Sequence, residues 1–368
     1  MKIALIGSRG IPANYGGFET FVDELSKRLV NDFNHDVIVV CDNEQRELNR
    51  GKEVLDGVKL IYSKYSKSKN AILYYYDSIT LALHHSDIIY SCGPAGALFG
   101  YLVYRQDKIL ITNPDGLNYK RAKWSKIVQK AFKWFDYFAS KNSDLVLCDS
   151  YGIEKYIKDE YNPKATAVIE YGAYPNQFIA VENPKVESVL NRYNLIPHKY
   201  HLVVSRLEPE NHLEMIIKGY KKSSREYPLI IIGNKNKYYN KLKKISNMSI
   251  LFLGGVYNSD ELSIIRANAL DYLHGHSVGG TNPSLLEAMA SKNITICHDN
   301  NFNREVAKDG LFFKNSDELD MILSKIEEQP NRYSNQIDEL YKRIVLYYNW
   351  GSIAKRYDKL FISMSKND

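Results

Sequence analysis

Short β-branched runs alternate with helix-patterned segments along most of this chain, and that alternation constrains the fold more than any other feature. Such runs, each bounded by turn residues or a helical pattern, are typical of buried strands in a mainly parallel sheet with helices on both faces. They fall in two sets, separated by a looser stretch at 175–199. The first set lies at 2–7, 36–41, 87–91, 108–112, 144–148 and 167–171, and the second at 202–205, 229–233, 250–253, 270–274 and 294–297. The pattern predicts an α/β chain of two Rossmann-like units.

The length supports this division, because 368 residues with 44% apolar content are enough for two compact cores. We place an N-terminal domain at 1–180, a C-terminal domain at 181–345 and a helical tail at 346–368. In this tail Trp350, Ile353, Tyr357 and Leu360 form one apolar stripe. The stripe predicts that the tail packs back on the first domain.

Composition narrows the cellular setting. The chain has no run of about 18 apolar residues and no secretory pattern after Lys2. Its four cysteines are scattered singly, as expected of buried hydrophobes in a reducing compartment. We therefore expect a cytoplasmic protein. The net charge of +6 favours anionic partners, without choosing between a nucleotide diphosphate and an acidic lipid surface.

The first strand runs into a glycine-containing loop at 7–20. Gly16 and Gly17 would let the backbone approach a ligand closely at the positive end of a helix, with Arg9 as a charge partner. This predicts a diphosphate cradle, although the glycines could equally shape the loop alone. The spacing departs from the dinucleotide fingerprint GxGxxG, which argues against an NAD enzyme.

The loop after the strand at 108–112 carries Asn113 and Asp115 at a carboxyl edge of the sheet, where parallel α/β sheets bind ligands. Asp115 could act as a general base or orient an acceptor hydroxyl. It could also be an ordinary turn residue, because the sequence Pro-Asp-Gly is typical of turns.

A basic, aromatic helix is predicted at 119–140, with Asp136 as its single acid. A cationic helix of this kind suits an anionic bilayer interface, although a solvated helix packed on the sheet would look similar. No nucleic-acid reading module is evident, so no nucleic-acid partner is expected. The membrane and acceptor candidates are Lys120, Arg121, Lys123, Trp124, Lys126, Lys130, Lys133 and Trp134.

In the second domain, Arg206 follows a strand and could make charge-assisted contacts to diphosphate oxygens. The alternative is a surface ion pair with Glu208 or Glu210.

The segment 272–290 is the most distinctive of the chain, because a strand enters a dense glycine and polar loop and then a helix. Ser284 and Glu287 have capping-box spacing, so Glu287 could cap the helix or bind a sugar hydroxyl. The loop could receive phosphate at the helix start. Its donor-binding candidates are His276, Gly280, Thr281, Asn282, Pro283, Ser284 and Leu285. The histidines lack zinc spacing and no Asp-x-Asp triplet is present, so we expect no metal and no cofactor.

Taken together, these motifs resemble retaining GT-B glycosyltransferases of family 4, in particular a bacterial rhamnosyltransferase group whose N-terminal region was catalogued as a domain of unknown function. The resemblance covers essentially the whole chain. It rests on the segments 7–20 (GSRGIPANYGGFET), 113–117 (NPDGL), 171–173 (YGA), 205–211 (SRLEPEN), 274–288 (HGHSVGGTNPSLLEA) and 298–305 (HDNNFNRE).

The resemblance implies the GT-B fold, with two Rossmann-like domains facing each other across a cleft. It implies that Gly16 and Gly17 approach the donor diphosphate, that Arg206 neutralises it, and that Glu287 contacts the nucleotide ribose. The loop 280–284 would hold the donor sugar and phosphate.

Two positions depart from the broad family. Gly279 stands where a Glu is usual, eight residues before Glu287, and Asn211 stands where a Lys is usual, five residues after Arg206. A 6-deoxy sugar on a deoxythymidine carrier presents fewer hydroxyls, which is compatible with a missing carboxylate.

The resemblance, with these two departures, implies transfer of L-rhamnose from dTDP-L-rhamnose, with retention, to a lipid-linked saccharide in capsular or exopolysaccharide assembly. The catalytic candidates are Asp115, Arg206 and Glu287. The enzyme would sit peripherally on the inner face of the plasma membrane. The alternatives are a UDP-sugar-dependent transferase of the same fold, a nucleotide-sugar epimerase or hydrolase, and a catalytically idle membrane adaptor that has kept nucleotide binding.

Overall fold

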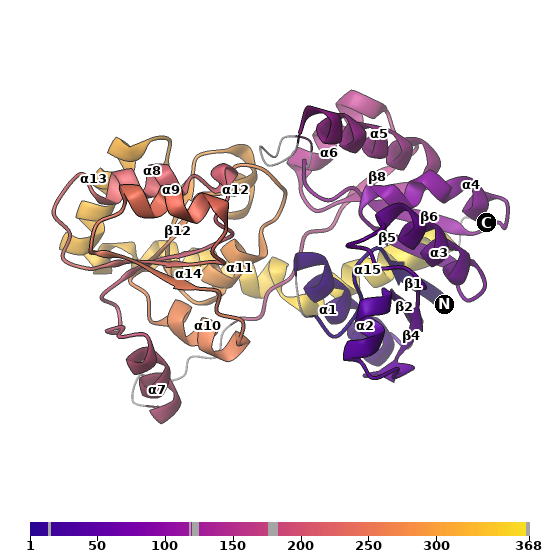
Figure 1. The fold of residues 1–368 in the computed structure, drawn as a ribbon, viewed down its shortest axis with the longest axis horizontal. Helices are drawn as coiled ribbons and strands as arrows, with labels where there is room; N and C mark the ends of the chain where they lie inside the picture. Colours follow the sequence, from indigo (N-terminus) through magenta and orange to yellow (C-terminus); the bar gives the residue numbers. More distant parts are fainter. Residues whose placement is uncertain (14–15, 118, 120–124, 176–182, 366–368) are drawn as a thin grey trace. The chain divides into compact units, whose positions relative to one another are not determined.

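The computed structural model of the chain describes residues 1–13, 16–117, 119, 125–175 and 183–365. These residues divide into two compact units (Figure 1). The first holds the described residues of 1–172 together with 350–365, and the second holds those of 173–349. The boundary predicted at 180/181 lies outside the described residues.

The first unit is built on an eight-stranded sheet with the strand order β3-β4-β2-β1-β5-β6-β7-β8. All described pairings are parallel except that of β3 with β4, which is antiparallel. The strands are β1 Lys2–Ile6, β2 Asp36–Cys41, β3 Val54–Leu55, β4 Val58–Tyr62, β5 Ile88–Cys92, β6 Ile109–Asn113, β7 Leu145–Cys148 and β8 Thr166–Val168.

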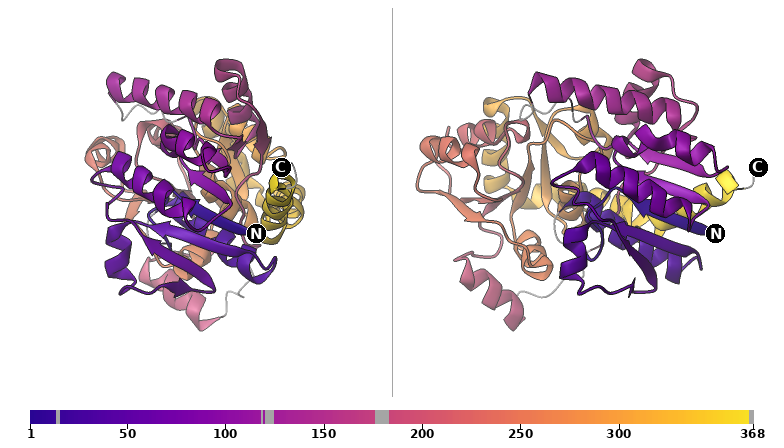
Figure 2. Two further views of the ribbon diagram at one scale, coloured as in Figure 1. Left: turned by 90° about the vertical axis from the view of Figure 1, so that its right-hand side faces the viewer. Right: turned by 45° about the vertical axis from the view of Figure 1, so that its right-hand side comes forward.

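Helices cover both faces of this sheet (Figures 1 and 2). In β1, Ala4 and Ile6 join an apolar cluster beneath α3, α4 and α5, while the adjacent Ile3 and Leu5 are equally buried. A strand that is buried on both faces must be apolar at successive positions, which explains the continuous runs in the sequence. The helices are α1 Gly17–Asn31, α2 Asn43–Leu48, α3 Ala71–Leu83, the 3-10 helix η1 Pro94–Phe99, α4 Gly100–Tyr104, α5 Lys126–Asn142 and α6 Tyr151–Tyr161.

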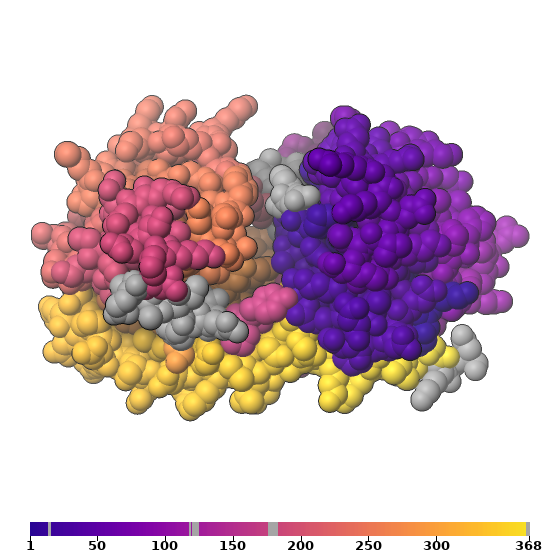
Figure 3. All heavy atoms as spheres, turned by 90° about the horizontal axis from the view of Figure 1, so that it is seen from below, coloured from indigo at the N-terminus to yellow at the C-terminus, as the bar shows by residue number. Residues whose placement is uncertain are grey.

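The last helix, α15 (Trp350–Ser365), belongs to the first unit and packs against α1. Its buried side chains Trp350 and Tyr357 lie with their ring centroids 6.5 and 5.4 Å from that of Phe21 in α1. Trp350 also lies so close to Gly172 that a Cβ there would be 2.4 Å from the indole. Figure 3 shows these C-terminal residues in yellow against the indigo N-terminal ones.

The second unit is a six-stranded parallel sheet with the order β11-β10-β9-β12-β13-β14. Its strands are β9 His201–Val204, β10 Leu229–Ile232, β11 Ile250–Gly254, β12 Asp271–His274, β13 Ile294–His298 and β14 Leu311–Phe313. One apolar cluster packs α8, α9 and α13 on one face, and a second packs α7, α10 and α11 on the other.

The helical elements of the second unit follow the same alternating order. They are α7 Pro184–Arg192, η3 Pro209–Asn211, α8 Leu213–Tyr220, α9 Lys237–Ile245, α10 Ser259–Ala267, α11 Pro283–Ala290, α12 Asn301–Val306, α13 Ser316–Glu328, η4 Pro330–Tyr333, α14 Ser334–Arg343 and the π-helical turn η5 Ile344–Tyr348.

The predicted strands agree closely with the observed ones, but three short strands were missed. β3 has two residues, β14 has three, and β4 has its polar Lys59 exposed, so none of them shows a continuous apolar run. The helical tail predicted from residue 346 is not continuous, because Asn349 has extended backbone (φ −72°, ψ 146°) between η5 and α15. The basic helix begins at Lys126 rather than at 119, because Ser125 caps it.

Among the described residues, no helix combines the length and the apolar character needed to cross a bilayer.

Candidate functional site

The loop after β1 is fastened to the start of α1 by two carboxylates. Glu19, which is 6% exposed, accepts a hydrogen bond from the backbone N–H of Arg9 at 2.9 Å, and Asp23 accepts one from that of Ala13 at 3.0 Å. Two amides of this loop are therefore satisfied by side chains of the helix that follows it.

The glycines of this loop fall into two kinds. Gly10 has φ +118° and would place a Cβ 2.5 Å from the sulfur of Cys41, so its backbone and packing both require glycine. Gly16 has extended backbone (φ −155°), and a Cβ there would meet only the Glu19 carboxylate at 3.0 Å. A Cβ at Gly17 would meet nothing within 4 Å. Neither Gly16 nor Gly17 is demanded by the fold, which leaves room for a ligand at the start of α1.

Asp115 follows β6 in left-handed backbone (φ +64°). The turn is made by its neighbour, because the Asn113 side chain accepts the Asp115 N–H at 2.8 Å and donates to the Tyr90 hydroxyl at 3.2 Å. The predicted turn is present, and the Asn113 side chain is an acceptor within it.

A second carboxyl, Asp136 of α5, lies within electrostatic range of Asp115 and is only 5% exposed. Burial raises its pKa to about 8, with a further upward contribution from Asp115 and a downward one from Lys133. Asp136 therefore holds a proton at neutral pH.

The outer face of α5 is basic and aromatic. Lys126, Lys130 and Lys133 are exposed, and Trp134 exposes 70% of its surface. A cavity of about 390 Å³ is lined by Lys133, Trp134, Tyr137, Phe138, Glu160 and Tyr161 of α5 and α6. The other predicted membrane residues, Lys120, Arg121, Lys123 and Trp124, lie outside the described residues.

In the second unit, the predicted capping box at the start of α11 is wrong. Asn282 is the N-cap, and its side chain accepts the Ser284 N–H at 3.0 Å. The Ser284 hydroxyl instead lies 2.7 Å from the Tyr272 hydroxyl and donates to the Val204 carbonyl at 3.1 Å. Glu287 is thus not needed for capping. Gly279 has φ +130°, and a Cβ there would meet nothing within 4 Å, so the place of the usual carboxylate is open.

The two predicted charged residues of this unit have different surroundings. Arg206 follows β9, is 61% exposed, and lies 3.9 Å from Glu208, whose side chain is only 15% exposed. Glu287 is 44% exposed and lies 2.5 Å from Arg266 of α10. Asn211, at the position of the usual lysine, is buried and donates to the Arg206 carbonyl at 2.7 Å, so it fixes the loop that carries Arg206.

Four histidines form two stacked pairs around the β12–α11 loop. The rings of His274 and His276 are 4.3 Å apart, and those of His212 and His298 are 4.0 Å apart. Burial lowers the pKa of His274, and His276 lowers it further. Burial likewise lowers the pKa of His298 to about 4, with His212 adding to the effect and Asp299 opposing it. His274 and His298 are therefore neutral, and His274 is a core residue.

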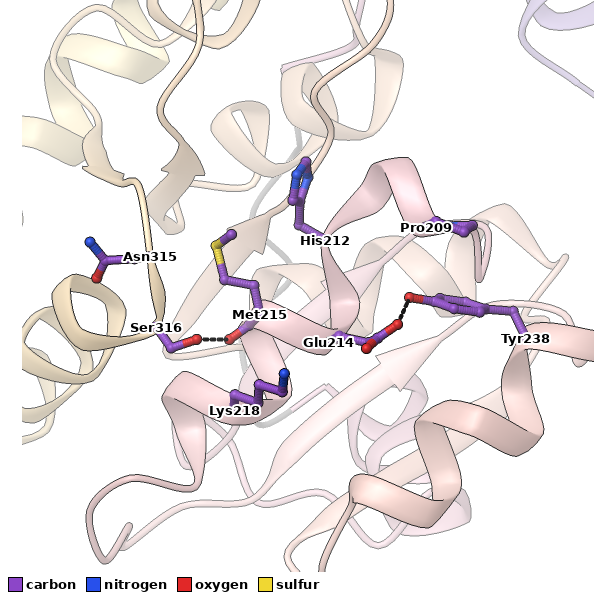
Figure 4. A pocket seen from close by; sticks show the side chains of 8 residues that line it. All are labelled: Pro209, His212, Glu214, Met215, Lys218, Tyr238, Asn315 and Ser316. Atoms are coloured by element: carbon purple, nitrogen blue, oxygen red, sulfur yellow. Dashed lines mark hydrogen bonds between the residues drawn. The ribbon is translucent and has the colours of Figure 1, made fainter. Parts of the chain in front are cut away.

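A further cavity of about 380 Å³ lies on the α8, α9 and α13 side of the second unit (Figure 4). It is lined by Pro209, His212, Glu214, Met215, Lys218, Tyr238, Asn315 and Ser316. Figure 4 shows Glu214 bonded to the Tyr238 hydroxyl, and Ser316 donating to the Met215 carbonyl at 3.2 Å. Neither Arg206 nor Glu287 lines it, so it is distinct from the predicted donor residues. Within the part of the chain that the structure describes, no group of three or more His, Cys, Asp or Glu side chains could hold a metal ion.

Comparisons with known proteins match both units. Residues 1–174 match a family model described as a domain of unknown function, DUF1972, and residues 194–343 match the model of glycosyl transferases group 1. The chain is 24% identical over 394 residues to an uncharacterized glycosyltransferase of Methanocaldococcus jannaschii, covering 98% of both chains. The chain is a glycosyltransferase with the GT-B fold, and its residues 194–343 match the group 1 model.

Solved structures similar to this glycosyltransferase share its fold at low sequence identity. Sucrose-phosphate synthase from Thermosynechococcus elongatus matches with a TM-score of 0.83 and 15% identity, covering 100% of this chain and 99% of the other. HepE of Anabaena in complex with UDP matches with a TM-score of 0.77 and 15% identity, covering 99% and 100%. The predicted α/β GT-B fold is confirmed, as is glycosyltransferase activity.

Within each unit of the glycosyltransferase, the predicted donor residues and Asp115 follow the carboxyl ends of parallel strands. In the first unit, Arg9, Gly16, Gly17 and Asp115 follow the carboxyl ends of β1 and β6. In the second unit, Arg206 follows β9, and the residues from His276 to Leu285 follow β12. Their roles in binding and catalysis stay predictions.

The sequence reasoning missed two residues that the structure adds. Asp136 was noted only as the single acid of a basic helix. A lone acid among basic residues was the sequence feature that could have singled it out. Arg266 gave no signal, because its contact with Glu287 joins residues of two different helices.

Proposed function

We propose that this glycosyltransferase transfers L-rhamnose from dTDP-L-rhamnose, with retention of configuration, to a lipid-linked saccharide in capsular or exopolysaccharide assembly. The observation that carries the proposal is the second unit's carboxyl edge, where an exposed Arg206 and a half-exposed Glu287 flank a glycine loop in a group 1 glycosyltransferase domain. Arg206 would neutralise the donor diphosphate and Glu287 would bind the nucleotide ribose.

The open position at Gly279 supports a donor sugar with few hydroxyls. A carboxylate at this place would bind sugar hydroxyls, but Gly279 offers neither a carboxylate nor a Cβ, and the space beside it is empty. A 6-deoxy sugar requires fewer hydrogen-bond partners, and an unfilled partner would cost binding free energy.

In the proposed reaction the acceptor hydroxyl attacks the anomeric carbon from the face on which the diphosphate leaves. The bond from that carbon to the leaving diphosphate oxygen breaks, and the diphosphate takes the hydroxyl proton. Arg206 stabilises the developing negative charge, and Asp115 orients the acceptor hydroxyl. Gly16 and Gly17 let the start of α1 approach the diphosphate.

The acceptor side of the proposal is a peripheral site at the inner face of the plasma membrane. The exposed lysines of α5 and the adjacent Trp134 suit anionic headgroups and the interface below them. The reaction as written uses no metal ion.

The test is turnover of purified enzyme with a panel of nucleotide sugars, preceded by thermal stabilisation with dTDP, UDP and their sugars. We expect selective stabilisation by dTDP and dTDP-rhamnose, and rhamnosyl transfer that EDTA does not abolish. Arg192→Gln, at an equally exposed arginine away from the loop, is the matched control for Arg206→Gln. Stabilisation by no nucleotide would contradict the proposal.

A UDP-sugar donor is the second candidate, and one observation favours it. HepE, which has a similar fold, was solved in complex with UDP and with UDP-glucose. A preference for UDP-sugars in the same panel would keep the transferase and exclude rhamnose as its donor sugar.

A further inference from the structure

Arg266 is a buried cation whose ion pair leads directly to a predicted substrate-binding residue. Its side chain is 6% exposed, and its terminal nitrogen lies 2.5 Å from the carboxylate of Glu287. Among the described residues, Glu287 is the one carboxylate within ion-pair distance of it. The Arg266 Nε is buried and has no hydrogen-bond partner in the described part of the chain.

The pair is asymmetric in exposure. Arg266 is buried, whereas Glu287 keeps 44% of its side chain exposed. An arginine cannot lose its charge in a protein, so a buried one requires a fixed counter-charge. Glu287 supplies this charge with one carboxylate oxygen, Oε2, and the pair restricts the rotamers that the remainder of the carboxylate can adopt.

The backbone that carries Arg266 is also fixed. Asn293 donates a side-chain hydrogen bond to the Arg266 carbonyl at 2.7 Å, and the side chain of Asn268 donates to the Ile264 carbonyl at 2.9 Å. The end of α10 is therefore held by buried amides. On the Glu287 side, the start of α11 is tied to the end of β9 through Ser284 and the Val204 carbonyl. Both partners of the ion pair are thus mounted on rigid elements.

We propose that Arg266 is a positioning residue that holds Glu287 ready for the ribose hydroxyls of the donor nucleotide. This inference rests on the proposed role of Glu287 in donor binding. A carboxylate that is already fixed loses less conformational entropy on binding than a mobile one. Arg266 therefore contributes to nucleotide affinity without touching the nucleotide.

Arg266→Met is the appropriate variant, because it removes the buried charge and keeps an apolar stem. The partner it leaves behind, Glu287, is half-exposed and can be solvated, so the fold should tolerate the change better than the reverse substitution.

Arg225 of the same unit provides a matched control. Its side chain is 2% exposed, it pairs with Asp320 and lies 3.8 Å from Glu327, and its Nε is likewise buried without a partner in the described residues. It contacts none of the predicted donor residues. Arg225→Met therefore shows how far the loss of a buried arginine changes nucleotide affinity merely by destabilising the fold.

The experiment measures Kd for UDP and dTDP by calorimetry in the full chain, for wild type, Arg266→Met, Glu287→Gln, the double variant and Arg225→Met. We expect Arg266→Met and Glu287→Gln each to weaken the better nucleotide roughly tenfold, and the double variant to be no weaker than Glu287→Gln. Arg225→Met should leave Kd unchanged, even if it lowers Tm.

Two outcomes separate the inference from the proposed function. Wild type that binds neither nucleotide would refute the donor site and this inference with it. The inference alone would be refuted if wild type binds a nucleotide and Arg266→Met binds it equally tightly. It would also be refuted if the losses of affinity in Arg266→Met and Glu287→Gln are strictly additive in the double variant. Should Arg266→Met fail to fold, a crystal structure of the wild-type nucleotide complex decides. Glu287 should bridge Arg266 and a ribose hydroxyl, and a Glu287 that leaves Arg266 to reach the ribose would overturn the proposal.

Discussion

The two units of the molecule share a Rossmann-like plan but place different charged groups after their strands. In the first unit the loop after β1 carries Arg9, whose amide is bonded to Glu19 of α1, and the loop after β6 carries Asp115, near the buried Asp136. In the second unit the loop after β9 carries the exposed cation Arg206, and α11 carries Glu287 paired with Arg266. The sheet and its helices decide where a loop lies, whereas the few residues of that loop decide what it can bind.

The buried charged groups of the two units also differ. Asp136 in the first unit is a buried acid whose pKa is raised to about 8. His201 in the second unit is a fully buried base, 2.8 Å from Asp271 and 3.0 Å from Glu327. Burial lowers the pKa of His201, but these carboxylates outweigh it and raise the pKa to about 9. Asp136 is thus a buried acid that is neutral at pH 7, whereas His201 belongs to a buried charged network.

The largest effect should come from Arg206. This is the residue of the second unit that we propose stabilises the leaving diphosphate. We expect Arg206→Gln to lower kcat/KM by about a thousandfold, because an amide carries no charge for the diphosphate. Steady-state transfer assays measure this, with Arg192→Gln as the control. Wild-type turnover in Arg206→Gln would show that the cationic loop is not the donor site.

The next effect tests the acceptor role of the first unit. Asp115→Asn should lower turnover by about a hundredfold with the fold unchanged, because asparagine tolerates the left-handed backbone that Asp115 adopts. Asp107→Asn, at an exposed aspartate that is also left-handed, should have no effect. If both variants retain full activity, Asp115 is a turn residue only.

The third prediction concerns the buried network of the second unit. His201→Gln should cost about 3 kcal/mol of unfolding free energy, because it leaves buried carboxylates without their cation. Since the folded pKa of about 9 exceeds the ordinary 6.5, the contribution of His201 is fully present below about pH 6.5 and is lost as the pH rises through about 9. Denaturant unfolding between about pH 6 and 10 should show this loss in wild type and not in the variant.

An exposed histidine of the same unit serves as the control for that experiment. His198→Gln should leave the unfolding free energy close to that of wild type. An identical pH dependence in wild type and His201→Gln would rule out the charged network.

A smaller effect of opposite sign is expected from the buried acid of the first unit. Ionisation of Asp136 is disfavoured in the folded state, so its contribution to stability is present at low pH and falls as the pH rises towards about 8. Asp136→Asn should therefore raise the unfolding free energy by about 1–2 kcal/mol at pH 8 and by little at pH 4. A variant that is less stable than wild type at pH 8 would indicate that the ionised carboxylate is stabilised by the fold.

The smallest effect distinguishes the basic surfaces of the two units. Lys130→Gln in α5 should weaken binding to vesicles of phosphatidylglycerol and phosphatidylcholine about fivefold, which is about 1 kcal/mol for one lysine at an anionic surface. Lys244→Gln, at an exposed lysine of α9 in the second unit, is the control and should bind as wild type does. If the two variants lose vesicle binding equally in a sedimentation assay, the positive charge of the protein attracts the membrane without a specific contribution from α5.

Local patterns made much of the fold predictable. Buried parallel strands such as β2 and β10 are apolar at every core position, so their runs are visible in the sequence. β14 is only three residues long and β4 lies near a sheet edge, so their pairing depends on neighbours that the sequence pattern does not show. The capping box at Ser284 had correct spacing, but the hydroxyl bonds Tyr272 and the Val204 carbonyl instead, because tertiary partners replaced the local one.

The sequence by itself determined the α/β class, the two sheets and the loops that hold the candidate residues, because hydrophobic periodicity and glycine-rich turns act over short stretches of chain. Only the tertiary structure decided which side chains become partners. Asp115 and Asp136 interact from a loop and a helix, Arg266 and Glu287 pair from two helices, and His201 reaches Glu327 across the second unit. Such contacts depend on how the helices and strands pack. The burial that results from packing then shifts the pKa values of these side chains and so sets their charge states.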